Sequence, residues 1–559
     1  MTPNPAKISV EITNVKLGAI VLLIFCLSLS FLIGNIGFQG DDWWIFSWPY
    51  WHAFPESIWL YARESLRPLE GVYWIVLFEL FGFNSKAFLV LSLLLHAGGS
   101  VLMGACLAKA FPQKNSLVAW SMLFAFLLPT ASNLTYMIHT DNSRLSVLLF
   151  WASVLSFQRW TEVSQSWRGL APGIILYLMA SLVYENATLL IFSTPLFLWP
   201  VYVREDKKLP RKRFCLRLFV GLLAAFVAFV VLRFTILSGG AVHHSQVVPS
   251  VHLIWSYVHV ACLYFLRPFV EVSTDKYAWA WGALVVFLSL VLLLRAWRMD
   301  RALQVEPAWE ASSGYVALVG AAVLILGLMP YLAAGYTSEM GFHSQSRVYS
   351  SATFGAAILA GLLVTMWRNE RAFIGAQVAG IVAVVLMAVF LAGLRNDWSE
   401  AAEKRRQLCS SLLTIIPDVR PETTFLFLDL QSYIGDRAVV FQGVEGLREF
   451  IRILYHKRDL NAYFLYPDRP DFVDSKGRKA VVSRQGVQAR GSGGRPPAPL
   501  DKLLILEKTG SRLNLLDGIS ASDHAAAIDW QGVDSIHSNK SLIISAPNGG
   551  RSRNDLCTE

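Results

Sequence analysis

The residues with the clearest chemical potential are two adjacent carboxylates, Asp41 and Asp42, in the segment QGDDWWIFSWPYWHAFPESIWLYARESLRPLEG. The pair directly follows the first apolar run of the chain. An aspartate at the centre of a membrane helix costs about 2.5 to 3.5 kcal/mol, so we expect both to lie just outside a bilayer. There a carboxylate can take a proton from a hydroxyl group or bind a metal ion. The alternative interpretation is a polar helix end, with the tryptophans and tyrosines as an interfacial belt.

Two arginines and one glutamate could bind a charged ligand. Arg347 could hold a phosphate by charge-assisted hydrogen bonds, or it could snorkel from a helix end. Arg67 could contact phosphate or pair with Glu64 or Glu70. Glu185 lies between two apolar runs, where acids are usually functional, although a wet turn is the alternative.

Histidines and a third arginine offer further candidates. The loop GGAVHHSQVVPSVH contains His243, His244 and His252, but adjacent histidines rarely ligate one metal ion without carboxylate or sulfur ligands. His96 lies in an apolar run, where a hydrogen-bonded core histidine is the default. Arg267, in YFLRPFVEVSTDKY, could bind a phosphate-containing ligand or contact lipid headgroups.

Positioning these residues requires helices that cross a membrane. The 559 residues are 54% hydrophobic, with a mean hydropathy of +0.45. The sequence predicts an all-α polytopic membrane domain over 1–394, with an outer loop at 39–72. Because a crossing helix needs about 20 mostly apolar residues, we expect about eleven transmembrane helices. Their predicted limits are 17–38, 86–108, 116–131, 143–158, 169–184, 187–203, 215–238, 277–295, 314–336, 348–366 and 373–394.

Basic residues orient this domain. The formal net charge is +9, but the lysines and arginines cluster between apolar runs, as in REDKKLPRKR. This pattern is typical of cytoplasmic loops and argues against a nucleic-acid-binding face. Every second loop is basic, which predicts a cytoplasmic N-terminus in the plasma (inner) membrane. The segment 253–269 is predicted to be interfacial or re-entrant, because a full crossing would place the arginines after residue 294 outside.

An odd number of spans places residues 395–559 outside, as a small extracytoplasmic α/β domain. Strand-like runs such as TTFLFLDL alternate there with helix-like runs such as GLREFIRILYH. Cys409 and Cys557 lie in this polar tail and could form a disulfide if the tail is exported. The other cysteines fall in or beside apolar segments and lack a paired metal-binding spacing.

Several motifs follow one another in a characteristic order: FQGDDWW, LRPLEGVYWIVLFELFGFNSKAFLVLSLLLH, LFAFLLPTASNLTYMIHTDNSRL, SLVYENATLLIFSTPLF and HSQSRVYSSATFG. Together they resemble the GT-C superfamily of glycosyltransferases that use lipid-phosphate sugars. The nearest pattern is the protein O-mannosyltransferase-like branch, including the transmembrane and TPR-containing O-mannosyltransferases. In the opening motifs the matching residues are Asp41, Asp42, Arg67, Pro68, Leu69, Gly82 and His96.

The chain departs from this family pattern at two positions and in its tail. Asn133 stands where the family has an acidic residue, and Tyr184 stands where it has a lysine before Glu185. Asp141 lies nearby and could substitute for the missing carboxylate. The tail has no recognisable TPR array. These departures indicate a branch with another substrate.

The resemblance implies inverting transfer of a hexose or pentose from a polyprenyl-phosphate-linked donor to an extracytoplasmic glycan, lipid or protein acceptor. It implies Asp41 or Asp42 as the base that deprotonates the acceptor. The same pair could also bind a divalent cation, Mg²⁺ or Mn²⁺. Donor phosphate binding is assigned to Arg347, Arg67 and Arg267. Substrate contacts are assigned to Glu185, Asn133, Asp141 and Tyr349.

Three other functions remain open. A lipid or polysaccharide flippase or transporter would need charged residues inside several spans and often paired half-repeats. An O-antigen ligase or polymerase would depend on arginine and histidine in a large outer loop between spans. A non-catalytic scaffold would use the outer domain to bind a partner.

Overall fold

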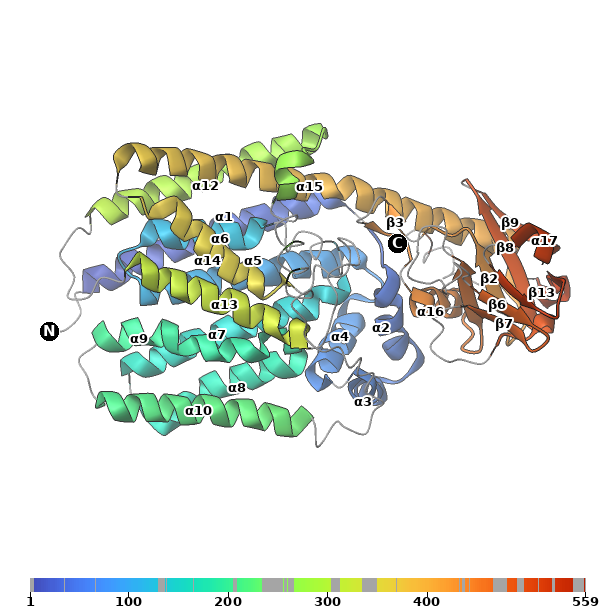
Figure 1. Cartoon of the computed structure of the whole chain (residues 1–559), viewed down its shortest axis with the longest axis horizontal. Coiled ribbons are helices and arrows are strands. Elements are labelled where there is room, and N and C mark those ends of the chain that lie inside the picture. The colour runs from blue at the N-terminus through green and yellow to red at the C-terminus, as the bar shows by residue number, and fades with distance from the viewer. Residues whose placement is uncertain are drawn as a thin grey trace. The chain divides into compact units, whose positions relative to one another are not determined.

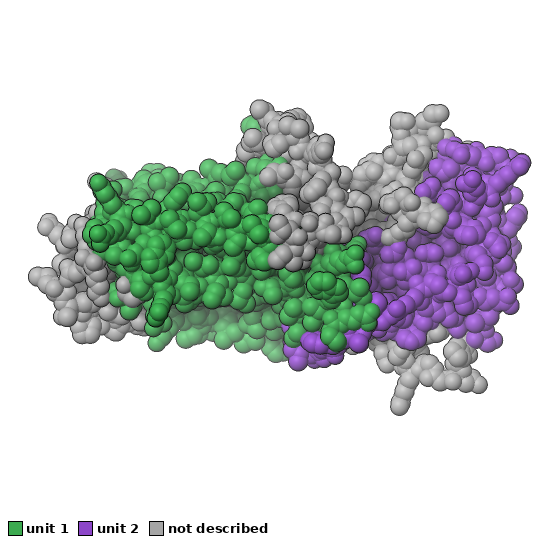
Figure 2. All heavy atoms as spheres, turned by 90° about the horizontal axis from the view of Figure 1, so that it is seen from below, with its two compact units in different colours: residues 1–34, 55–76, 87–395 green, residues 35–54, 77–86, 396–559 purple. Residues whose placement is uncertain are grey.

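The computed structural model describes residues 5–34, 36–65, 67–128, 136, 138–163, 165–204, 209–233, 255, 259, 266–302, 312–333, 349–367, 369–431, 433–434, 438–441, 443–465, 480–489, 497–510, 512–524, 528–545 and 557. The chain divides into two compact units, which Figure 2 colours separately. The first, here called the helical unit, consists of Met1–Gly34, Pro55–Val76 and Ala87–Arg395. The second, here called the mixed unit, consists of Asn35–Phe54, Leu77–Lys86 and Asn396–Glu559. The mixed unit therefore combines the C-terminal region with two short segments from the first hundred residues.

The helical unit consists of apolar helices that run side by side (Figure 1). The helices that lie wholly or partly in it are α1 (Pro5–Ile33), α3 (Phe54–Ser65), α4 (Pro68–Phe81), α5 (Ser85–Ala110), α6 (Asn115–Leu127), η3 (Ile138–Thr140), α7 (Asp141–Val163), α8 (Trp167–Val183), η4 (Glu185–Ser193), α9 (Thr194–Arg204), α10 (Arg211–Val231), α12 (Lys276–Ala302), α13 (Ser313–Ala333), α14 (Ala352–Thr365) and α15 (Glu370–Ile415).

Among the described residues, seven helical segments are long and apolar enough to cross a membrane. They are Val15–Ile33, Ser85–Ala110, Glu185–Arg204, Arg211–Val231, Lys276–Arg301, Ser313–Leu332 and Glu370–Ile415. Helices α6, α8 and α14 are apolar but shorter. Each of the eleven predicted spans overlaps a helix, so the membrane character of the region agrees with the sequence, but the count of eleven stays a prediction.

One predicted boundary differs from the structure, and one predicted helix is mostly outside the described residues. The last span was expected to end at residue 394, whereas α15 continues without a break to Ile415. The predicted interfacial helix at 253–269 lies mostly outside the described residues.

Contacts between helix termini bring several basic loops together at one end of the helical unit, here called the basic end. Lys109, at the end of α5, donates to Glu162 at the end of α7 over 2.6 Å, and Arg204 of α9 donates to the Lys109 carbonyl over 2.8 Å. Asp300 of α12 accepts from the Asn115 amide over 2.8 Å, which satisfies an otherwise unpaired donor at the start of α6. The predicted basic loops that begin near Lys109, Glu162, Arg204 and Asp300 thus share one end of this unit.

Glycines allow α13 and α14 to pack backbone to backbone. A Cβ atom built on Gly355 would lie 2.6 Å from the Gly320 carbonyl oxygen, and one built on Gly327 would lie 2.7 Å from the Ala352 nitrogen. Both distances are too short for any side chain. Small residues at such crossings let membrane helices gain van der Waals contact that bulkier residues would prevent.

The mixed unit is centred on a four-stranded sheet with the order β5-β2-β8-β9. Strand β2 (Thr424–Leu428) is buried throughout and pairs in parallel with β5 (Asn461–Leu465) and β8 (Leu503–Thr509), while β9 (Arg512–Leu516) is antiparallel to β8. Parallel strands need a long connection, and the one between β2 and β5 contains α16 (Gly443–Tyr455). Helix α16 buries an apolar stripe at helical spacing. The stripe consists of Leu447, Phe450, Ile451 and Leu454.

Shorter elements complete the mixed unit. They are β1 (Asp418–Val419), β3 (Tyr433–Ile434), β4 (Ala438–Val439), β6 (Ala480–Ser483), β7 (Gly486–Ala489), η8 (Leu500–Lys502), β10 (Gly518–Ser520), α17 (Ala521–His524), β11 (Ile528–Gln531), β12 (Ser535–His537), η9 (Lys540–Leu542) and β13 (Ile543–Ile544). The small strand-containing C-terminal region predicted from the sequence is confirmed.

Helix α2 (Gly40–Trp51) belongs to the mixed unit and packs on α16. A Cβ atom on Gly446 would lie 2.6 Å from the Gly40 carbonyl carbon, so the two backbones are in contact. One turn further along α16, the Phe450 ring meets the Trp43 ring edge-on, with centroids 5.0 Å apart. Trp43 also contacts Phe38 at 5.7 Å. The acidic segment after the first predicted span is therefore part of the core of the mixed unit.

A disulfide joins Cys409, in α15, to Cys557. The bond closes a loop of 148 residues that contains every strand described in the mixed unit. Closing so long a loop removes conformational freedom from the unfolded chain and stabilises the fold by about 3 to 5 kcal/mol. The pairing that the sequence left open is thus present.

Replacing Cys557 by serine is expected to lower the thermal midpoint of the mixed unit, and reductant is expected to have the same effect on the parent protein. The measurement is thermal unfolding of the purified full chain with and without dithiothreitol. A gel-shift assay that counts free thiols shows whether the disulfide is formed in each sample. The matched control is Cys215→Ser, because Cys215 is a free and exposed thiol. Equal midpoints for Cys557→Ser and the parent would contradict a stabilising bond.

Candidate functional site

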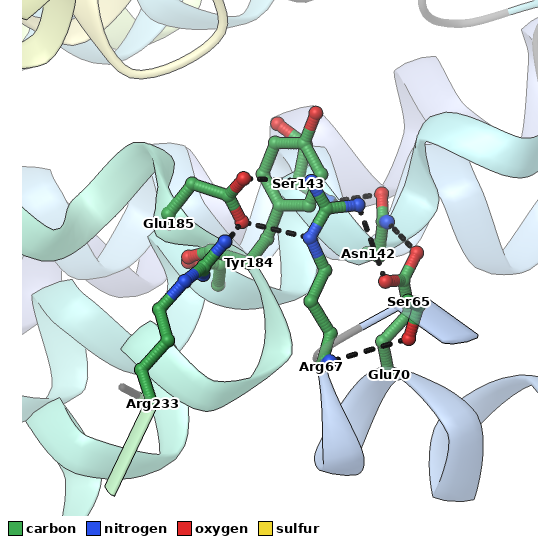
Figure 3. Close-up of polar contacts among 9 residues, drawn as sticks. Ser65, Arg67, Glu70, Asn142, Ser143, Tyr184, Glu185 and Arg233 are labelled. Atoms are coloured by element: carbon green, nitrogen blue, oxygen red, sulfur yellow. Dashed lines mark hydrogen bonds and ion pairs between the residues drawn. The ribbon is translucent and has the colours of Figure 1, made fainter. Parts of the chain in front are cut away.

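The candidate site in the helical unit centres on Arg67, which lies between two carboxylates (Figure 3). Its Nε donates to Glu185 Oε2 and its Nη2 to Glu185 Oε1, each over 2.7 Å. Its Nη1 donates to Glu70 Oε2 over 3.3 Å. Arg67 directly precedes α4, whose first residue, Pro68, suits a helix start because its missing N–H has no partner there in any case. Glu185 opens η4, so a bidentate pair joins segments 118 residues apart.

A second arginine and an aromatic ring complete the surroundings of Glu185. Arg233, just beyond α10, approaches Glu185 Oε2 with its Nη1 at 3.4 Å. The Arg67 guanidinium lies over the Tyr184 ring, with Cζ 4.3 Å from the ring centroid. A planar guanidinium can stack on an aromatic face while its edge holds a carboxylate. Arg67 is therefore fixed on two sides.

A neutral polar network adjoins the charged residues. At the start of α7, Asn142 donates through Nδ2 to Glu70 Oε1, and its Oδ1 accepts from the Ser143 amide over 2.6 Å. Asn186 donates to the Ser143 hydroxyl at 2.7 Å and to the Ser350 hydroxyl at 3.0 Å. The network ties the starts of α7 and η4 to the residues before α14, which gives the site a rigid frame.

Burial differs within this cluster of two cations and two anions. The Glu70 side chain is 3% exposed, whereas those of Arg67, Glu185 and Arg233 are 22%, 30% and 21% exposed. Burial alone would lower the pKa of Arg67, but the carboxylates of Glu185 and Glu70 outweigh it and raise that pKa well above its ordinary value. Burial raises the pKa of Glu70, against the attraction of Arg67. A polar or anionic ligand could thus reach Glu185, Arg67 and Arg233, whereas Glu70 is the buried member of the cluster.

Asp141, proposed as a substitute carboxylate, lies beside this network. It begins α7, is fully buried, and interacts electrostatically with Arg144 one turn later. Arg144 is also buried and donates through Nη1 to the Ser92 hydroxyl. The charges of Asp141 and Arg144 compensate each other inside the helical unit, which is the usual way for buried ions to be tolerated.

The twin aspartates belong to the mixed unit, in the first turn of α2. Asp42 is fully buried, and its Oδ2 accepts from the Gln39 amide over 2.8 Å, so it caps the helix N-terminus. It also interacts electrostatically with Arg405 of α15, whose Nη2 donates to the Ile36 carbonyl over 2.5 Å. Asp41 is half-buried. Asp42 thus has a structural task, and Asp41 is the more accessible of the two carboxylates.

The described residues contain no cluster of three or more histidine, cysteine, aspartate or glutamate side chains suited to a metal ion. Asp41 and Asp42 alone offer two carboxylates, one of which caps a helix. Mg²⁺ is often held by one or two carboxylates together with substrate phosphates. The pair therefore fits a cation only if further ligands come with the substrate.

The remaining candidate residues are scattered. Arg267 pairs with Glu271 one helical turn later, at 2.9 Å. Tyr349 is buried in an apolar cluster that includes Tyr184. His96 is buried and its Nε2 lies 3.2 Å from the Phe126 carbonyl oxygen, as expected for a core histidine. Five candidates lie outside the described residues: Arg347, Asn133, His243, His244 and His252.

No protein-family model matches the chain, and no curated protein or solved structure is similar to it at a significant level. The resemblance to glycosyltransferases rests on the sequence motifs alone.

Two residues of the cluster had not been singled out from the sequence. Arg233 lies within the predicted span 215–238, and a charged residue inside an apolar run is itself a signal of function. Asn142, which adjoins the cluster, lies within the motif LFAFLLPTASNLTYMIHTDNSRL, but it carries no charge and was not assigned a role. Glu70 was foreseen only as an alternative partner of Arg67.

Proposed function

We propose that the chain is a GT-C-type membrane glycosyltransferase that moves a sugar from a polyprenyl-phosphate donor to an extracytoplasmic glycan, lipid or protein acceptor. The observation that carries the proposal is the bidentate pair of Arg67 and Glu185. These residues come from two separate motifs of the family-like series, and such motifs would be expected to meet if they form one site. The apolar helices of the same unit support a membrane setting.

In the proposed reaction, the acceptor hydroxyl attacks the anomeric carbon of the donor as its bond to the phosphate oxygen breaks. The hydroxyl proton passes to a carboxylate, for which Asp41 is the better candidate because Asp42 caps α2. Polyprenyl phosphate leaves, with Arg347 as the proposed partner of its charge. Arg67 and Glu185 hold the polar part of a substrate, and Asn133, Asp141, Tyr349 and Arg267 remain proposed contacts.

The proposed topology has eleven crossings of the plasma membrane, a cytoplasmic N-terminus and an extracytoplasmic C-terminal region. The grouping of Lys109 and Arg204 at one end of the helical unit supports a cytoplasmic basic end. The disulfide between Cys409 and Cys557 supports export of the C-terminal region, because such bonds persist in oxidising compartments.

A transporter of lipid or polysaccharide is the second candidate, favoured by the buried pair of Asp141 and Arg144. Charged residues inside a membrane bundle often mark substrate or ion pathways. Unlike a transferase, a transporter would leave the sugar–phosphate bond intact.

The test uses the purified full chain in vesicles with a panel of radiolabelled polyprenyl-phosphate hexoses and pentoses, with glycan, lipid and peptide acceptors. We expect one donor to release polyprenyl phosphate in an acceptor-dependent manner, and Arg67→Ala to remove most of that release. Translocation of intact donor lipid without release would establish the transporter instead. Release unaffected by Arg67→Ala would remove the cluster from the reaction.

A further inference from the structure

An apolar groove runs along the surface of the helical unit between η4–α9 and α10. It has a volume of about 260 Å³ and is lined by Phe192, Pro195, Trp199, Leu218, Leu222 and Leu223, among others. Its floor is a packed cluster in which the Tyr202 and Phe214 rings stack with centroids 4.1 Å apart. The groove is therefore a built feature of the packing between helices.

The groove follows the helix axis within a candidate membrane span. On α10 its lining residues extend from Phe214 to Leu223, which corresponds to about 14 Å of helix. Both flanking segments, Glu185–Arg204 and Arg211–Val231, are long and apolar enough to cross a bilayer. A hydrocarbon chain lying parallel to these helices would match the groove in polarity and direction.

Basic residues stand at one mouth of the groove. Arg211, Lys212 and Arg213 form the exposed first turn of α10, directly before the first lining residue, Phe214. Arg211 lies over the ring of Trp199, itself a lining residue, with Cζ 4.6 Å from the ring centroid. Stacking leaves the N–H edge of a guanidinium available for bidentate binding of phosphate. The mouth thus complements an anionic headgroup.

We propose that this groove binds one anionic phospholipid of the leaflet at the basic end, with an acyl chain along α10 and the phosphate at Arg211 and Arg213. Basic pockets between transmembrane helices are known to bind anionic headgroups, and each basic side chain near the surface contributes about 1 kcal/mol. The site is separate from the cluster around Arg67, which adjoins the opposite end of α10 through Arg233. The inference does not depend on the proposed reaction.

The test is native mass spectrometry of the full chain released from nanodiscs that contain equal amounts of phosphatidylglycerol and phosphatidylcholine. The parent protein is expected to retain one phosphatidylglycerol in preference to phosphatidylcholine. Arg211→Ala and Arg213→Ala are each expected to reduce that preference about fivefold. The charge control is Arg295→Ala with Arg298→Ala, because both arginines are exposed near the end of α12, also at the basic end.

A bulky side chain in the groove tests whether the groove binds the acyl chain of the lipid. Leu223→Trp is expected to abolish retention, whereas Val227→Trp, one turn further along α10 and outside the lining, is expected to leave it unchanged. Both side chains are exposed, at 41% and 48%, so neither change disturbs the core. Retention by Leu223→Trp equal to the parent would overturn the proposal. It would also fail if the α12 double variant lost the preference as fully as the α10 variants, or if both lipids were retained equally by the parent.

Discussion

Replacing Glu185 by glutamine is expected to reduce sugar transfer about 100-fold, the scale of loss that follows when a substrate is misplaced by about 1 Å. Glutamine has nearly the shape of glutamate, but it cannot supply two acceptor oxygens to the Nε and Nη2 atoms of Arg67. Arg67 would keep at most one of its two hydrogen bonds to residue 185, beside the longer contact with Glu70, and the carboxylate charge that faces Arg233 would be lost. The measurement is kcat and KM with the donor identified in the vesicle assay.

The matched control is Glu162→Gln, which breaks the ion pair with Lys109 at the basic end. The Glu162 and Glu185 side chains are similarly exposed, at 27% and 30%, so the two substitutions remove a charge from similarly hydrated positions. Transfer should be unchanged in Glu162→Gln. Equal losses in both variants would mean that Glu185 acts only through the general stability of the fold.

Replacing Gly355 by leucine is expected to force α13 and α14 apart and to give the largest loss of stability among the changes considered. The new side chain would start 2.6 Å from the Gly320 carbonyl oxygen, and a backbone group, unlike a flexible side chain, cannot move aside. Overpacking of a core commonly costs about 1 to 3 kcal/mol, and a clash with backbone belongs at the upper end or beyond. Thermal unfolding in detergent and the fraction of monodisperse protein measure the effect.

Gly375→Leu provides the control for this prediction. Gly375 lies in α15, and a Cβ atom there would meet nothing within 4 Å. Its thermal midpoint should equal that of the parent or exceed it, because leucine has a higher helix propensity than glycine. A midpoint for Gly355→Leu as high as that of Gly375→Leu would show that the two helices do not need their close approach.

Composition and apolar run length predicted where the apolar helices of the helical unit lie, because both report on whether a helix can replace water by lipid, but how many of these helices cross a membrane stays a prediction. They failed at the end of α15, where the apolar run stops near residue 394 but the helix continues to Ile415. The sequence WSEAAEKRRQ that follows is rich in strong helix formers, so propensity extends the helix after hydropathy ends. The packing of α2 on α16 had no local signal at all, since it depends on complementary shapes far apart in the chain.

In the candidate site, too, the sequence predicted local contacts but not those between segments far apart in the chain. The Arg67–Glu70 pair was foreseeable because residues three apart at a helix start are neighbours. Glu185 was foreseeable as an acid between apolar runs. Their bidentate pairing was not, because it depends on how α4 and η4 approach each other in three dimensions. The capping task of Asp42 agrees with the alternative of a polar helix end, which the sequence left open because the same residue types at the same position serve both a helix start and a catalytic pair.

The packing of α2 on α16 has a consequence for dissecting the protein. A soluble fragment that begins at Asn396 would contain every described strand and the disulfide, yet it would lack Gly40, Trp43 and Phe38. The aromatic face of Phe450 that Trp43 covers would be exposed to water, and so would the α16 backbone at Gly446. Such a fragment is expected to self-associate, and joining residues 36–54 to it through a short linker should restore a monomer.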